Sequence, residues 1–240
     1  MILHLRNLLT NRGIHQRKEE FISNLYFNIS MLYQQLQKRA RETAEKAPEE
    51  VLLKMQEATR ELVQQNITEN SLKEGNEAPE FSLPNKDGKT ISSQDLKQPL
   101  IISFYRGSWC PFCNLEMAAW EKIYPEVKKA GAELIAISPN TELKVKEMQK
   151  KHNVEFELLS DLGNTVAKQF GLVFTLPEML RPVYKDFGIN IPEDNGDNTY
   201  EIPIPATYII KDGKVAYAYV EVNHKIRAEP SEVLEALNDL

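Results

Sequence analysis

The feature that most constrains the fold is a junction between an apolar run and a helical segment in the middle of the chain. Residues 100–105 are almost continuously apolar, which is typical of a central strand buried on both faces. Residues 111–129 have a helical pattern, and Pro111 suits a first helical turn. Pro125 predicts a kink or a break inside that helix. A buried strand that leads directly into a helix predicts an α/β fold.

The segments around this junction alternate between short strands and helices. The sequence predicts strands at 81–83, 89–91, 134–138, 156–159, 206–210 and 214–220, and helices at 142–152, 165–170, 177–187 and 231–240. Turn signals separate them, including Asp212-Gly213 in an expected hairpin. This alternation is typical of βαβ units.

The first part of the chain has a different composition and hydrophobic pattern. Residues 14–65 contain no glycine and a single proline, Pro48, where a second helix is expected to begin. Apolar residues recur at helical spacing, namely Phe21, Leu25, Phe27, Met31, Leu32 and Leu36. We expect a helical arm or hairpin over 1–70 and a separate domain over 76–240. The arm would be an amphipathic lid on that domain or the surface of a homodimer.

The composition excludes several classes of function. With 29 Lys and Arg against 35 Asp and Glu, the formal net charge is −6, which argues against general affinity for nucleic acid or anionic membranes. No stretch reaches the roughly 18 apolar residues of a membrane span. The opening residues lack the pattern of a signal peptide, so we expect a cytoplasmic protein.

The chain has 2 cysteines, Cys110 and Cys113, both at the strand–helix junction. The first turn of a helix has unpaired N–H groups and the positive end of the dipole, so a thiolate there has a lowered pKa. Cys113 lies one turn deeper on the same face, where it can attack a sulfur bonded to Cys110. Pro111 would stiffen the ring of a Cys110–Cys113 disulfide, and Trp109 would shield one side of the site.

Two other interpretations of the cysteine pair are a buried inert dithiol and half of a metal site. The 4 histidines show no metal-ligand spacing to one another or to the cysteines. We therefore expect redox chemistry, without a metal or a cofactor. Pro205, just before the strand at 206–210, supports this if its peptide bond is cis, because backbone groups would then face a neighbouring site.

With Pro205 downstream, the stretch from Trp109 to Cys113 resembles the thioredoxin-like superfamily. Within it, the chain looks like the peroxiredoxin-like proteins of the alkyl hydroperoxide reductase/thiol-specific antioxidant group. The matching stretches lie at 78–83, 104–116, 159–171 and 205–210. The resemblance implies a three-layer α/β/α sandwich with a mixed central sheet. It does not cover the helical arm.

The sequence also departs from the peroxiredoxin pattern Pro-x-x-x-Thr-x-x-Cys. Counted back from Cys110, the Pro and Thr positions hold Ser103 and Gly107. Counted back from Cys113, they hold Arg106 and Cys110. In addition, Pro205 stands where peroxiredoxins place an activating arginine on a strand.

The sequence therefore leaves open which of the two cysteines is the attacking thiol. The thioredoxin pattern makes Cys110 the attacker and Cys113 the resolving thiol, which we favour because of the helix N-terminus and the expected solvent access. Glu116, three residues after Cys113, matches one peroxiredoxin subgroup and favours Cys113 instead. Glu116 itself is expected to interact with the helix dipole, with a proton shuttle as the alternative.

The remaining candidates near the site are basic and aromatic. Arg106 would stabilise a thiolate or align a peroxide oxygen, unless it is an exposed strand-end arginine paired with a carboxylate. Arg227 is expected to be structural. In the irregular segment 175–200, Tyr184, Phe187, Asp194, Asp197 and Tyr200 would decorate the surface or, alternatively, shape a pocket or a dimer contact.

The function expected from the resemblance is thiol-dependent reduction of hydrogen peroxide or organic hydroperoxides. A Cys110 sulfenic acid would condense with Cys113, and thioredoxin, another dithiol or glutathione would reduce the disulfide. The alternatives are a protein-disulfide reductase and a non-enzymatic interaction protein whose dithiol is a redox switch.

Overall fold

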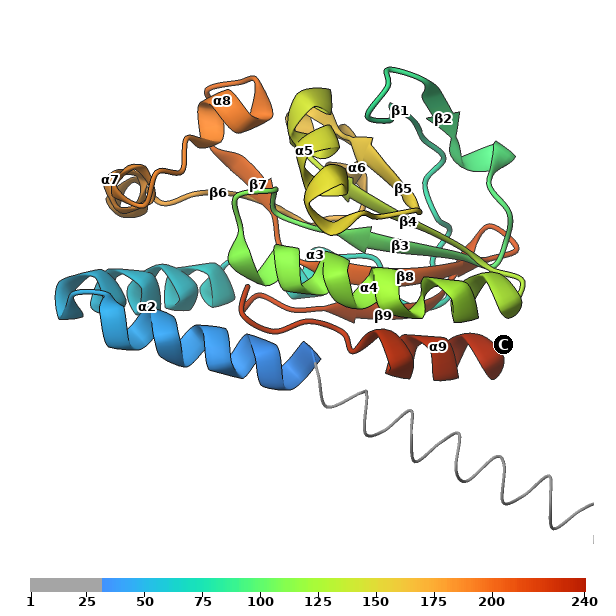
Figure 1. Cartoon of the computed structure of the whole chain (residues 1–240), viewed down its shortest axis with the longest axis horizontal. Helices are drawn as coiled ribbons and strands as arrows, with labels where there is room; N and C mark the ends of the chain where they lie inside the picture. Colours follow the sequence, from blue (N-terminus) through green and yellow to red (C-terminus); the bar gives the residue numbers. More distant parts are fainter. Residues whose placement is uncertain (1–31) are drawn as a thin grey trace, which may run out of the picture.

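A computed structural model describes residues 32–240, and its centre is a five-stranded mixed sheet in the order β5-β4-β3-β8-β9 (Figure 1). The strands are β3 (Leu100–Phe104), β4 (Glu133–Ser138), β5 (Glu157–Ser160), β8 (Ala206–Lys211) and β9 (Lys214–Val220). β3, β4 and β5 are parallel, whereas β8 and β9 are antiparallel to their neighbours. The predicted strand at 100–105 is thus the middle strand, and all of its residues are buried.

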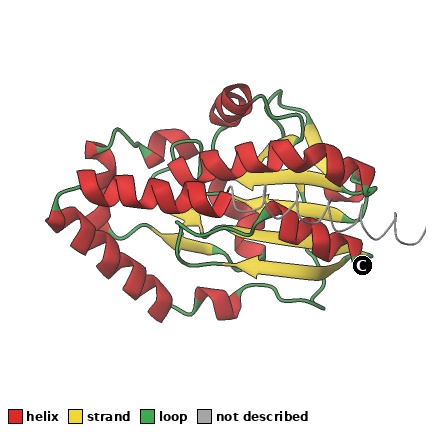
Figure 2. Cartoon of the chain, turned by 60° about the horizontal axis from the view of Figure 1, so that its bottom comes forward, coloured by secondary structure: helices red, strands yellow, loops and turns green. Residues whose placement is uncertain are grey.

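Helices cover one face of the sheet in a continuous layer. α4 (Pro111–Lys129), α5 (Glu142–His152) and α9 (Pro230–Asn238) pack with the side chains that β3, β4, β5 and β8 direct to this face. Figure 2 shows helices lying across the strands, and α4 and α9 run side by side. α4 runs unbroken through Pro125, so the predicted break is wrong. Packing on both sides of the helix offsets the roughly 3 kcal/mol that an interior proline costs.

The opposite face is covered by smaller elements. α6 (Thr165–Gln169), α3 (Ile67–Asn70) and the antiparallel pair of β1 (Ser82–Pro84) and β2 (Thr90–Ser92) pack over it. A short 3-10 helix, η1 (Ser93–Asp95), follows β2, and η2 (Leu162–Asn164) precedes α6. The fold is therefore the α/β/α sandwich with a mixed central sheet that the resemblance implied.

The described part of the arm is a pair of helices, over residues 32–46 and in α2 (Glu49–Gln64). They lie along the edge of the molecule as a hairpin (Figure 1). Leu32 and Leu36 are buried in the core formed with α4 and α9, and Leu62 of α2 packs in the core on the other face. The predicted apolar positions before residue 32 lie outside the described residues, and the division into an arm and a domain stays a prediction.

The segment after α6 is built from short elements. β6 (Val173–Thr175) pairs with β7 (Glu201–Pro203), and between them lie η3 (Glu178–Leu180), α7 (Arg181–Asp186) and α8 (Ile191–Asn195). The helix expected at 177–187 is present as η3 and α7. The β6–β7 pair was not predicted, and part of the segment expected to be irregular is α8.

Candidate active site

The site is built at the N-terminus of α4, where the backbone leaves the central strand. Cys110 is the N-cap residue of α4 and Pro111 occupies the first helical turn. The Cys110 N–H donates to the Gly107 carbonyl at 3.1 Å, and the side-chain amide of Asn114 donates to the carbonyls of Ser108 and Cys110 at 2.8 Å each. These bonds hold the turn that carries the first cysteine, as the sequence predicted for a strand–helix junction.

Both sulfurs are buried in the reduced protein. Cys110 is 1% exposed and Cys113 is 0% exposed, so the expected solvent access of Cys110 is wrong. Burial raises the pKa of Cys110, but a hydrogen bond from Cys113 and the charges of Arg106 and Arg227 outweigh it and hold the pKa well below the usual value. Burial and the adjacent Cys110 sulfur raise the pKa of Cys113 well above the usual value. The pKa of Cys110 is therefore the lower of the two, which favours the thiolate at Cys110.

Arg106 contacts this thiolate from the end of β3. Its Nη1 lies 4.0 Å from the Cys110 sulfur, its Nη2 donates to the Tyr184 hydroxyl, and its guanidinium stacks over Trp109, 4.9 Å from the ring centre. Arg106 is 3% exposed, so the exposed, carboxylate-paired alternative is wrong. Its Nε has no hydrogen-bond partner within the described part of the chain.

The position of Tyr184 differs from the predicted one on the surface. Rather than decorating the surface, it is buried from α7 against Trp109, with the ring centres 5.6 Å apart in an edge-on arrangement. Trp109 thus packs against Arg106 and against a residue from the segment between β6 and β7. The segment between β6 and β7 ends shortly before Pro205 in the sequence. No local pattern in it indicates which of its aromatic side chains is buried.

A buried ion pair lies under the second cysteine. Arg227 donates through Nε to Glu116 at 2.6 Å and through Nη2 to the Cys113 sulfur at 3.2 Å. Ser103 donates to the other oxygen of Glu116 at 3.2 Å. The Glu116 carboxylate therefore forms an ion pair with the Arg227 side chain. The predicted interaction, with the N-terminal end of the helix dipole, is not the one that holds it. Burial raises the pKa of Glu116, and the Arg227 charge opposes that rise.

Sequence reasoning missed the part that Arg227 plays at this site. It lies in the loop before α9, 114 positions after Cys113, so no local spacing connects the two residues. Its guanidinium also donates to the carbonyls of His224 and Ile226. The only available signal was its position just before a helix that begins with Pro230.

His224 lies close to Arg227, which donates to its carbonyl, and to Phe112 of α4. Its ring packs edge-on against Phe112 with 5.6 Å between ring centres. Burial and the charges of Arg106, Arg227 and Lys225 lower the pKa of His224 well below its usual value. The imidazole is therefore neutral at physiological pH and adds no positive charge to the site.

Gly107 explains why the threonine of the peroxiredoxin motif is absent in the register of Cys110. Its φ is +152°, and a Cβ at this position would lie 2.4 Å from Trp109 Nε1 and 3.0 Å from Asn140 Nδ2. Asn140 in turn accepts a hydrogen bond from the Ser108 N–H at 2.7 Å. Any side chain with a Cβ at position 107 would thus clash with the Trp109 ring in its observed position.

Above the cysteines lies a cavity of about 380 Å³ that the thiolate helps to line. Its walls come from the arm, from residues 106–112, from the segment that carries Tyr184 and Phe187, and from His224 and Lys225. Cys113 does not line it. Of the two cysteines, Cys110 therefore borders the open space.

Pro205 has a different place from the one predicted. The Ile204–Pro205 peptide bond is trans, and the cis bond among the described residues is Gln98–Pro99. Pro205 lines a separate cavity of about 40 Å³ together with Arg106 and His224. It is close to the arginine of the site, but it does not line the space over the cysteines.

No three His, Cys, Asp or Glu side chains within residues 32–240 are grouped as metal ligands would be. No helix in that range is long and apolar enough to cross a bilayer.

Comparison with known proteins identifies the family. The model of the AhpC/TSA family matches residues 75–218. The chain belongs to the AhpC/TSA family. Chloroplastic peroxiredoxin Q of Oryza sativa subsp. japonica is 33% identical over 170 residues, which are 69% of this chain and 67% of the relative. This AhpC/TSA protein is an oxidoreductase of the thiol peroxidase type, as expected from the sequence.

Other relatives of this AhpC/TSA chain include the thiol-disulfide oxidoreductase ResA of Bacillus thuringiensis subsp. konkukian, 32% identical over 134 residues, which are 55% of this chain and 76% of that protein. Among solved structures, peroxidoxin BcpB of Mycobacterium tuberculosis aligns with a TM-score of 0.57 at 21% identity, over 70% of this chain and 98% of that one. AhpC of the same organism aligns with a TM-score of 0.53 at 17% identity, over 70% and 92%. These structures share the thioredoxin-like fold.

Proposed function

We propose that the protein reduces hydroperoxides with Cys110 as the attacking thiolate and Cys113 as the resolving thiol. The observation that carries the proposal is the arrangement of the two sulfurs. Cys110 has a lowered pKa and lines the cavity, whereas Cys113 lies beneath it as a protonated donor. The thiolate is the nucleophilic form of cysteine, so the cysteine that borders the cavity is also the one expected to react.

In the first step, the Cys110 thiolate attacks the terminal oxygen of the hydroperoxide. A sulfur–oxygen bond forms and the oxygen–oxygen bond breaks, which gives a Cys110 sulfenic acid and an alkoxide that takes a proton from water. Arg106 Nη1, 4.0 Å from the sulfur, is placed to stabilise the charge that moves onto the departing oxygen.

In the second step, the Cys113 sulfur attacks the sulfur of the sulfenic acid. The thiol proton leaves with the hydroxyl group as water, and a Cys110–Cys113 disulfide remains. Arg227, 3.2 Å from the Cys113 sulfur, favours the thiolate of Cys113 as it forms. An external dithiol of the thioredoxin type then donates two electrons and two protons and regenerates both thiols.

The same Arg227 contact favours a second assignment, in which Cys113 is the attacker. In that case Arg227 would stabilise the Cys113 thiolate directly. The position of Glu116, three residues after Cys113, favoured the same assignment in the sequence. We favour Cys110 because the cavity meets its sulfur, whereas a peroxide would have to pass Cys110 to reach Cys113.

Mass spectrometry of the two single variants separates these assignments. Cys113→Ser, treated with one equivalent of hydrogen peroxide and a sulfenic acid probe, is expected to carry the modification on Cys110. Cys110→Ser should remain unmodified over the same time and show no peroxidase turnover with thioredoxin and its reductase. Modification of Cys113 in Cys110→Ser, with none on Cys110 in the other variant, would overturn the assignment.

A protein-disulfide reductase is the second candidate, favoured by the dithiol motif and by the ResA relative. The peroxiredoxin Q relative, which aligns with a larger share of this chain, favours the peroxidase over this candidate. Reduction of insulin at a rate comparable to thioredoxin, without consumption of peroxide, would support the reductase. Stoichiometric oxidation without turnover would support a redox switch.

The homodimer through the arm and the cytoplasmic location belong to the same proposal. The arm exposes the side chains of Tyr33, Leu53 and Val63, which a second copy could cover. Sedimentation of the full chain tests this part: a monomer at all concentrations would reject the dimer without affecting the chemistry.

A further inference from the structure

The cavity over Cys110 is closed by a part of the chain that the family model does not cover. Residues 39–47 and Met55 of the arm form one wall, whereas the match to the AhpC/TSA family begins at residue 75. The other walls belong to the matched region and to the loop before α9. The arm therefore decides the size and chemistry of the space in front of the thiolate.

The cavity is far larger than hydrogen peroxide requires. A water molecule needs about 10–15 Å³ of such space, and hydrogen peroxide needs roughly twice that. The observed volume is about 380 Å³, within the range of sites that enclose whole organic ligands. A peroxide with a substantial organic body would fill it.

Many of the side chains that line the cavity are apolar. The lining side chains of this kind are Trp109, Phe112, Tyr184, Ile189, Met55, Ala47 and Phe187. Phe187 is 49% exposed, so part of this apolar lining faces solvent. Such walls favour an alkyl or aryl body over a hydrated polar one.

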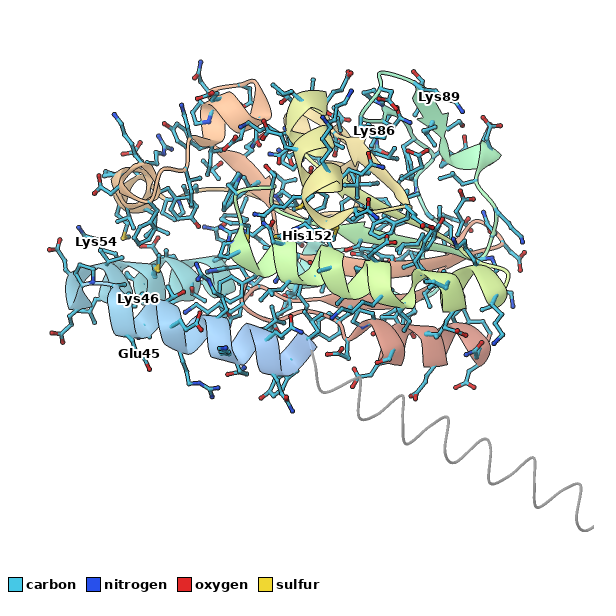
Figure 3. All side chains as sticks on the ribbon, viewed as in Figure 1. Glu45, Lys46, Lys54, Lys86, Lys89 and His152 are labelled. Carbon is cyan, nitrogen blue, oxygen red and sulfur yellow. The ribbon has the colours of Figure 1, made fainter. Side chains whose placement is uncertain are left out.

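The rim of the cavity is positively charged. Arg39, Lys46 and Lys225 line it with one carboxylate, Glu42, which lies 3.8 Å from Arg39. Lys46 and Lys225 have no ion pair within the described part of the chain, and Figure 3 shows Lys46 where the first arm helix ends. Within residues 32–240, an anion at this rim would meet two lysines that form no ion pair with a carboxylate.

We propose that the arm selects the substrate, and that the site takes hydroperoxides with an extended apolar body and an anionic group such as a carboxylate. The peroxide group lies at Cys110, the body lies along the aromatic walls, and the carboxylate lies at Lys46 and Lys225. The proposal rests on the peroxidase function argued above, and it adds the class of hydroperoxide and the residues that recognise it.

The test compares three substrates with the reduced full-length protein: hydrogen peroxide, the hydroperoxide of linoleic acid and the methyl ester of that hydroperoxide, the lipids below their micelle concentrations. Stopped-flow tryptophan fluorescence gives the second-order rate of Cys110 oxidation. We expect the acid to react at least about tenfold faster than hydrogen peroxide, and about threefold to tenfold faster than its ester, as one or two partly exposed ion pairs allow.

Variants of the rim and the wall make the test specific. Lys46→Gln with Lys225→Gln is expected to bring the ratio of acid to ester rates close to one. Lys54→Gln, which removes the same charge from α2 away from the cavity, should leave all rates unchanged. Met55→Trp, which fills the arm side of the cavity, should lower both lipid rates relative to hydrogen peroxide.

The outcomes separate the two proposals. Equal rates for the acid, the ester and hydrogen peroxide in the native chain would overturn the substrate inference and leave the peroxidase intact. An acid-to-ester ratio that Lys46→Gln with Lys225→Gln does not change would overturn the assigned recognition. If no peroxide oxidises Cys110 in any variant, the proposed function itself fails.

Discussion

Removal of one partner from the Glu116–Arg227 pair is expected to destabilise the protein strongly. Both side chains are 1% exposed and their N–O distance is 2.6 Å, so neither charge can turn to water. At an effective dielectric constant near 20, two charges 4 Å apart attract by about 4 kcal/mol. Loss of one partner from a buried pair costs about 3–5 kcal/mol. We therefore expect Glu116→Leu to lower the free energy of unfolding by about that amount.

The double variant Glu116→Leu/Arg227→Met separates charge from packing. Replacement of a whole buried pair by apolar side chains is often close to neutral, so the double variant should be more stable than Glu116→Leu alone. Recovery will be partial, because Arg227 also satisfies the carbonyls of His224 and Ile226. Urea unfolding of the reduced proteins, followed by the fluorescence of the two tryptophans, measures each free energy.

A second ion pair of the same length provides the control. Lys168 and Glu201 also approach to 2.6 Å, but their side chains are 49% and 26% exposed. Glu201→Leu should cost no more than about 1 kcal/mol through loss of that pair. Two results would contradict the reasoning. The loss of unfolding free energy could be as small for Glu116→Leu as for Glu201→Leu, or the losses for Glu116→Leu and Arg227→Met could be additive in the double variant. In either case burial does not set the strength of this ion pair.

Three further changes test other parts of the structure. Gly107→Ala should displace Trp109 and cost about 1–3 kcal/mol of stability, read from urea unfolding and tryptophan fluorescence; an unchanged midpoint would contradict the clash. Burial raises the pKa of Glu229 to about 7, above its usual 4.5, so this group makes stability fall as pH rises between these values. Glu229→Gln should remove that part of the pH dependence in unfolding curves from pH 4 to 8, and identical slopes would reject it. Cys113→Ala should raise the pKa of Cys110 by removing its hydrogen-bond donor, which thiolate absorbance against pH measures; a pKa that stays or falls would refute the donor assignment.

Local patterns predicted most of the elements because those elements depend on local physics. The apolar run at 100–105, the helix that starts at Pro111 and the hairpin around Asp212-Gly213 were all found where they were expected. Burial on both faces, helix capping and turn geometry are encoded by neighbouring residues. The β6–β7 pair was missed because its strands are three residues long and pair across an irregular segment.

The site was predicted only in part for the same reason. Cys110, Cys113, Trp109 and Arg106 are close in sequence, and their proximity in space follows from a single turn. Glu116 was identified but was given the wrong partner. Pro205 was placed near the site, but with the wrong peptide geometry.

The sequence by itself determined that a dithiol stands where a buried strand enters a helix, because strand burial, the first-turn proline and the spacing of the cysteines are local properties. Only the tertiary structure decided what surrounds the sulfurs: Arg227 beneath Cys113, Tyr184 against Arg106, and the arm across the cavity. Those contacts join residues far apart in the chain. Their choice depends on which surfaces pack together, and packing is a property of the whole fold.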